Sequence, residues 1–145
     1  MEKTEKFKRT FDRFEKAFVK FKEIIKSKDL FDFLNQELIV EVTTKRFEYT
    51  FESMCQALRE YLRREGIDSP TPLRVFKESF KSGLISEGQE AVFLEMLEKR
   101  NQIVHVYDLK QAENIYNFLK SEKVFSAIEE LYSNLKREIG IKTVS

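Results

Sequence analysis

The sequence has very few of the residues on which several classes of protein depend. Its 145 residues include one cysteine, one histidine and no tryptophan, with only four glycines and two prolines. The single cysteine, Cys55, cannot form an internal disulfide, which is typical of proteins kept in a reducing cytoplasm. Because Cys55 and His105 are far apart in the chain, they offer no cluster of zinc ligands, and we expect no metal site. The shortage of glycine and proline leaves too few turn residues for an all-β fold.

Long apolar runs and cofactor-binding motifs are missing as well. No stretch approaches the roughly eighteen consecutive apolar residues that indicate a membrane-spanning helix. Residues 1–6 are mostly charged, so the start of the sequence lacks the apolar segment of a signal peptide. We therefore expect a soluble, cytoplasmic protein that does not enter a membrane. The sequence has no glycine-rich phosphate loop and no serine in a nucleophile elbow, so we expect no bound cofactor.

Charge is abundant but balanced. Charged residues make up 35% of the chain, yet the formal net charge is only +1. This composition suits long helices with one face in water. It argues against a protein that coats nucleic acid through bulk electrostatics, because such domains are usually strongly basic. A small, local site for a nucleic acid is still compatible with it.

Phenylalanine, with fourteen copies, marks the first predicted helix. Apolar side chains recur there at spacings of three and four, which places them on one helical stripe: Phe7, Phe11, Phe14, Phe18, Phe21 and Ile25. Such a stripe is either a platform on which bases stack or one side of a core. We favour the core, because apolar stripes at this spacing are usually buried.

The rest of the chain predicts further helices. The second runs from Asn35 to Glu65 and is capped by Gly66; its β-branched residues 39–44 are weak helix formers that packing should hold in place. After the proline-containing residues 69–72, a short helix ends near Gly83.

The last two predicted helices complete the fold. Ser86, with Gln89 three residues later, forms a predicted capping box for the fourth helix. A final helical stretch runs from Leu109 to Ile139 and stops at Gly140. We expect an all-α, antiparallel up-and-down bundle of four to five helices, with residues 1–140 as a single domain and 141–145 as a frayed tail.

The only histidine lies in the segment that carries the candidate site. Arg100 precedes His105 by five residues, which is about 140° of rotation on a straight helix, so the two would not share a face. The β-branched residues around His105 favour the end of the helix here. Either the chain bends so that the two groups converge, or a second copy completes the site. A lone histidine can also be purely structural, but a histidine and a guanidinium together can move protons and hold a phosphate without a metal.

Residues 100–108 (RNQIVHVYD) resemble the R-x4-6-H signature of HEPN domains, in the R-x4-H-x-Y form of HepT-type toxins. These toxins have also been named nucleotidyltransferase substrate-binding proteins. Residues 46–52 (RFEYTFE), the prolines at 69–72 and residues 80–85 resemble the same family in the same order. Met54 and Cys55 depart from the pattern, since many relatives have an aromatic residue there. We expect Cys55 to be a small buried hydrophobe and not a nucleophile.

The resemblance implies a homodimer whose motifs form a shared cleft, a separate minimal nucleotidyltransferase as partner, and RNA as substrate of a metal-independent endoribonuclease. It implies that His105 is the acid/base, Arg100 the phosphate clamp and Asn101 a polar supporter, with Asp108 orienting a neighbour. It further implies that the partner silences the toxin by transferring AMP to Tyr107. The alternatives are a non-catalytic subunit that presents a substrate to the nucleotidyltransferase and, with least support, a structural helical adaptor.

Overall fold

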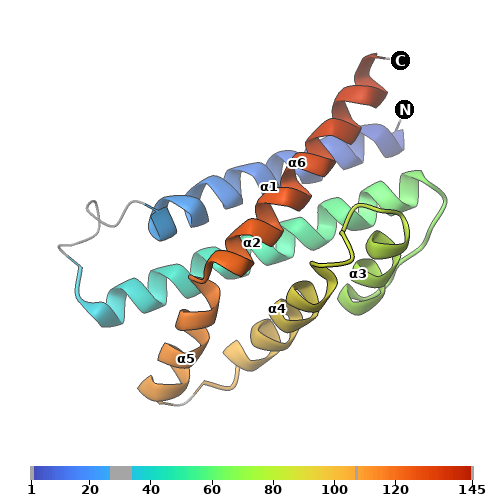
Figure 1. Ribbon diagram of the computed structural model, residues 1–145. Coiled ribbons are helices and arrows are strands. Elements are labelled where there is room, and N and C mark those ends of the chain that lie inside the picture. Colours follow the sequence, from blue (N-terminus) through green and yellow to red (C-terminus); the bar gives the residue numbers. More distant parts are fainter. Residues whose placement is uncertain (1, 27–33, 107, 145) are drawn as a thin grey trace.

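The computed structural model describes residues 2–26, 34–106 and 108–144, and the side chains of these residues up to Gly140. Within these ranges the chain forms six helices and no strand, namely α1 (Glu2–Lys26), α2 (Gln36–Arg64), α3 (Pro72–Lys81), α4 (Glu90–Ile103), α5 (Leu109–Leu119) and α6 (Glu122–Val144). The long helices α1 and α2 lie side by side, α3 and α4 follow α2, and the beginning of α1 and the end of α6 lie at the same end of the bundle (Figure 1). The predicted all-α bundle is confirmed, with six helices in place of four to five.

The extra helix comes from a break in the predicted stretch from Leu109 to Ile139. The chain turns at Lys120 and Ser121, where the Ser121 hydroxyl donates to the carbonyl of Phe118 at 2.6 Å and the Ser121 carbonyl accepts from the amide of Phe125 at 3.2 Å. These bonds satisfy backbone groups that a helix end leaves open. Leu119 and Val124 are buried on either side of the break, so the apolar pattern gives no sign of it.

Two predicted helix ends are wrong, and both involve local backbone chemistry. Ser86 does not cap α4; its carbonyl accepts from the amide of Gln89 in a turn, and the helix begins at Glu90. The Gln89 side chain makes no cap bond, and its amide nitrogen donates to Glu130 at 3.1 Å. Gly140 does not stop α6, which continues to Val144, since its φ is not positive and it offers no left-handed cap.

The predicted bounds of the second helix are confirmed to within one residue at each end. Asn35 accepts from the amide of Leu38 at 2.8 Å and so starts α2, and Gly66, with φ 86°, follows its end. The weak helix formers at residues 39–44 are helical, as expected from packing on α1.

The phenylalanine row of α1 is the centre of the core: Phe7, Phe11, Phe14, Phe18 and Phe21. All five are at most 6% exposed, so the core interpretation is confirmed and a stacking platform on this helix is excluded. Near the end of α1, Ile24 is buried and the predicted Ile25 is only partly buried.

A second set of rings carries the core from α1 across to α4. Neighbouring ring centroids are 5.4 to 6.1 Å apart along the chain of Phe21, Phe47, Phe51, Phe76 and Phe93. These separations are typical of favourable aromatic pairs. Four helices are thereby tied together through one row of contacts, which we name the ring chain. None of the helices in the described part of the molecule is both long enough and apolar enough to span a membrane.

The phenylalanine row predicts a large effect of a single truncation. Phe14 is fully buried, and Phe14→Ala should lower the free energy of unfolding by about 3–5 kcal/mol through lost apolar burial and a cavity. Val19, on the same helix, is 57% exposed, and Val19→Ala should change the free energy of unfolding by less than about 0.5 kcal/mol. Urea unfolding monitored by circular dichroism measures both, and equal losses would contradict the assignment of the core.

Candidate functional site

Arg100 lies in the last turn of α4 and points toward α2. Its Nη2 forms an ion pair and hydrogen bond with the carboxylate of Glu52, and the guanidinium carbon lies 5.6 Å from the ring centre of Phe51. Phe51 belongs to the ring chain, so the surface under the guanidinium is part of the core. The Arg100 side chain is still 34% exposed and that of Glu52 50%. Arg100 is thus held from two sides while part of it faces solvent.

His105 lies just beyond the end of α4. The helix ends at Ile103, Val104 is its C-cap, and the amide of His105 donates to the carbonyl of Gln102 at 2.9 Å. The predicted end of the helix near His105 is confirmed. The imidazole is exposed and makes no hydrogen bond with any residue that the structure describes.

No hydrogen bond joins the side chains of Arg100 and His105 within the described part of the chain. Arg100 is turned to α2, whereas His105 stands in the turn that leads from α4 toward α5. Convergence of the two groups within one chain stays a prediction. Completion of the site by a second copy stays a prediction.

The other predicted site residues have different surroundings. The Asp108 carboxylate accepts from the amide of Gln111 at 2.8 Å and caps the start of α5. Asn101 is exposed, and its side-chain oxygen is 3.4 Å from Nη1 of Arg100, a long hydrogen bond. Tyr107 lies outside the described residues. The supporting roles of Asn101 and Asp108 and the regulatory role of Tyr107 remain predictions.

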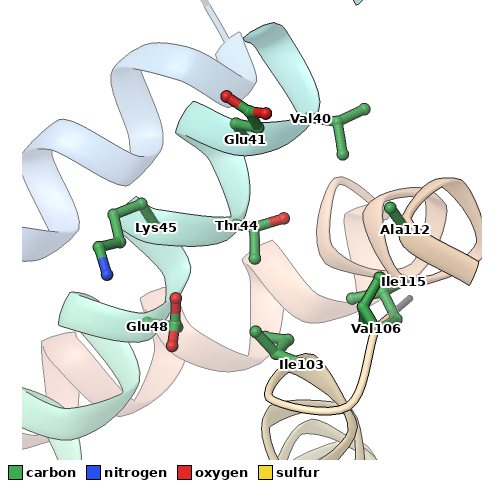
Figure 2. A pocket seen from close by; sticks show the side chains of 9 residues that line it. All are labelled: Val40, Glu41, Thr44, Lys45, Glu48, Ile103, Val106, Ala112 and Ile115. Atoms are coloured by element: carbon green, nitrogen blue, oxygen red, sulfur yellow. The ribbon is translucent and has the colours of Figure 1, made fainter. Parts of the chain in front are cut away.

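A pocket of about 210 Å³ adjoins this turn. It is lined from α2 by Val40, Glu41, Thr44, Lys45 and Glu48, and from the other side by Ile103, Val106, Ala112 and Ile115. Figure 2 shows Val40 and Thr44 facing Ala112, Ile115 and Val106 across the pocket, with Ile103 at its edge. Ile103 and Val106 flank His105 in the chain. The pocket and the turn that carries His105 therefore share one wall.

Sequence reasoning missed Glu52 and the pocket. Residues 46–52 were identified only as a stretch that resembles the family. The same stretch contains Glu52, Glu48 and Tyr49, which is 61% exposed. The unusual β-branched run at residues 39–44 was the other available signal, because Val40 and Thr44 belong to the pocket wall. Neither signal indicates which other helix lies opposite these residues of α2.

Cys55 is 5% exposed and free. Burial raises the pKa of its thiol, the nearby Glu52 raises it further, and Arg100 and Arg59 only partly oppose this. A thiol that holds its proton is a poor nucleophile. The prediction that Cys55 is a small buried hydrophobe is confirmed. Over the described residues, no three histidine, cysteine, aspartate or glutamate side chains gather into a group able to hold a metal ion.

Known proteins share both sequence and fold with this chain. Residues 9–137 match the family described as nucleotidyltransferase substrate binding protein like. No curated protein matches the sequence. A solved structure from Thermus thermophilus is 29% identical, with a TM-score of 0.73, covering 86% of this chain and 99% of that one.

Two further solved structures are much less similar in sequence but similar in fold. A mutant of the toxin–antitoxin MntA-HpeT has a TM-score of 0.70 at 11% identity and covers 92% of this chain and 98% of its own. A tri-AMPylated Shewanella oneidensis HEPN toxin in complex with MNT antitoxin has a TM-score of 0.69 at 11% identity, covering 90% and 96%. At this identity the likeness concerns the fold, which is the helical bundle expected for a HEPN domain. Since the family match spans most of the chain, this protein belongs to the family of nucleotidyltransferase substrate binding protein like proteins.

Proposed function

We propose that this protein is a HepT-like, metal-independent endoribonuclease of the cytoplasm that acts with a separate minimal nucleotidyltransferase. The observation that carries the proposal is the pair of motif groups at the end of α4, where Arg100 is braced by Glu52 and Phe51 and His105 is exposed. The family match and the fold shared with a HEPN toxin solved in complex with MNT antitoxin support the same function and partner.

The proposed reaction is cleavage by the ribose 2′-hydroxyl of the RNA itself. A neutral His105 accepts the proton of this hydroxyl while its oxygen attacks the adjacent phosphorus. The bond from phosphorus to the 5′-oxygen breaks, and that oxygen takes up a proton as it leaves. The products are a 2′,3′-cyclic phosphate and a 5′-hydroxyl. Arg100 binds the phosphate oxygens and stabilises the negative charge that grows on them.

We propose that two copies of the chain form a homodimer and complete the site together. Arg100 pairs with Glu52 and has no hydrogen bond to His105 within the described residues, and in the proposed dimer a cleft shared by two copies supplies both groups from both chains. One histidine then serves as base and the other as the acid that protonates the leaving oxygen. Closed two-fold pairing of this kind is the commonest form of oligomer.

The second candidate is a non-catalytic subunit that presents a substrate to the nucleotidyltransferase. It is favoured by the ion pair between Arg100 and Glu52, which neutralises the one motif group that would attract a phosphate. The net charge of +1 points in the same direction. Variants of the two motif groups separate this candidate from the first.

Removing either motif group should abolish RNA cleavage. We expect His105→Ala and Arg100→Ala to lower the cleavage rate by about 100-fold or more, the range typical of lost acid–base or charge stabilisation. Arg74→Ala is the control, since Arg74 is an exposed arginine on α3. Cleavage of a labelled RNA by purified protein measures the effect. A wild-type protein that leaves RNA intact, or a His105→Ala variant of equal activity, would refute the endoribonuclease and leave the substrate-binding subunit.

Glu52 should act as a positioning residue for Arg100. Glu52→Gln removes the negative charge, so we expect kcat to fall by about tenfold, as for the loss of one charge-assisted hydrogen bond, while KM for RNA also falls because the phosphate no longer competes with a carboxylate. Glu52→Asp keeps the charge and should recover part of kcat. An increase of kcat in Glu52→Gln would instead identify Glu52 as an inhibitor of the site.

Modification of Tyr107 should switch the activity off. The Tyr107 hydroxyl attacks the α-phosphorus of ATP on the partner enzyme, pyrophosphate leaves, and a tyrosyl-AMP phosphodiester forms. The added bulk and negative charge beside the cleft repel RNA. After co-expression with the partner, peptide mass spectrometry should find one or more AMP groups on Tyr107, and Tyr107→Phe should stay unmodified and active. Silencing without an adduct on Tyr107 would contradict this mechanism.

A further inference from the structure

The pocket beside the His105 turn has a composition unlike that of a simple packing defect. Its opposite walls carry five apolar side chains, two of which, Val40 and Ile115, are buried; the others are Ile103, Val106 and Ala112. Its volume of about 210 Å³ is below the range of roughly 300–1,000 Å³ usual for sites of drug-sized ligands. Facing apolar walls at this size suit one small, flat ring system.

Among the charged residues that line the pocket, Glu41 and Lys45 are exposed and Glu48 is the one that is half-buried. The Glu48 carboxylate makes no hydrogen bond or ion pair with any residue in the described ranges. Lys45, the nearest lysine along the helix, has its ammonium 5.7 Å from the ring centre of Tyr49. A half-buried carboxylate gains most from a ligand that brings N–H donors to it, because removal from water costs a charge its hydration.

We propose that this pocket binds the nucleobase next to the phosphodiester bond that Arg100 and His105 act on, with guanine preferred. This inference rests on the proposed endoribonuclease function. The apolar walls hold the faces of the base, as single-stranded RNA recognition commonly requires, and Glu48 reads its hydrogen-bonding edge. Ile103 and Val106, which flank His105 in the chain, line the pocket, so the proposal puts the ribose and phosphate of the bound base on the side of the pocket nearest this turn.

The preference for guanine follows from the donors on each base. Guanine presents a ring N–H and an amino group side by side, which match the two oxygens of a carboxylate. Adenine and cytosine each present one amino group. Uracil presents a ring N–H between two carbonyl oxygens, which a carboxylate repels. The expected order is therefore guanine first and uracil last.

A second copy of the chain is the competing occupant of the pocket. An apolar side chain from another protomer would fill the walls but leave the Glu48 carboxylate without a donor, which carries a cost in free energy. The nucleobase satisfies both the walls and the carboxylate. The experiment treats the second copy as one of its outcomes.

The first test measures binding and does not depend on cleavage. Guanosine 5′-monophosphate and uridine 5′-monophosphate are titrated into the full-length His105→Ala protein while methyl resonances are followed by NMR. We expect saturable shifts at Ile103, Ala112 and Ile115 with the guanine nucleotide, and at least about tenfold weaker binding of the uracil nucleotide, the effect of losing one good hydrogen-bonded pair. Glu48→Gln should remove the difference between the two nucleotides.

A blocking variant adds a matched control. Ala112→Phe places a ring in the pocket and should abolish the shifts, whereas Ala91→Phe adds the same ring at an exposed alanine of α4 and should leave them unchanged. If Ala112→Phe fails to fold, the loss of the difference between guanine and uracil nucleotides in Glu48→Gln still tests whether the pocket binds the base. Shifts that follow protein concentration and ignore nucleotide would assign the pocket to a second copy and overturn the proposal.

The second test measures cleavage. RNAs that differ only in the base beside one cut site should be cut fastest by the wild-type protein when that base is guanine, and Glu48→Gln should cut them all alike. Cleavage with no base preference and no nucleotide-induced shifts would overturn the pocket while the endoribonuclease stands. Guanine-specific shifts without any RNA cleavage would keep the pocket and overturn the endoribonuclease.

Discussion

The burial of phenylalanine between α1 and α2 is the constraint on which the rest of the structure depends. The phenylalanine row of α1 packs along α2, and its rings also meet Phe125 and Tyr132 of α6, so two long helices are held against α1. From there the ring chain passes through Phe47 and Phe51 to Phe76 and Phe93, and so sets where α3 and α4 lie. Aromatic contacts of this kind add to the gain from apolar burial. The position of the end of α4, and with it that of the motif, follows from that row.

The same core also shapes the electrostatics of the site. Phe51 packs in the ring chain of the core and also lies under the Arg100 guanidinium. Glu52, the next residue along α2, reaches the same guanidinium from the helix surface. A cation held between an aromatic ring and a carboxylate is oriented before any phosphate arrives, which lowers the cost of ordering it on binding.

Much of the fold could be predicted from the sequence, and the misses have a common cause. The spacing of the phenylalanine row, Asn35 and Gly66 carry local signals that the structure confirms. The break at Ser121 could not be predicted, because the apolar pattern continues through it and local hydrogen bonds of the backbone and of the Ser121 hydroxyl mark it. In the site, Arg100 and His105 could be identified from the sequence as candidate residues through their motif. The partner Glu52 and the pocket wall could not, since both depend on which helices face each other.

The connection between α4 and α5 is short, and each of its described ends has a structural task. Val104 closes α4, Val106 lines the pocket, and Asp108 caps α5, all within five positions. Any insertion or deletion there would move the histidine, the pocket wall and the helix cap together. The face of α2 that carries Thr44 and Glu48 is free of this restriction. During evolution, or in a designed library, changes in ligand preference can therefore arise on α2 one residue at a time, while the length of the connection stays constant.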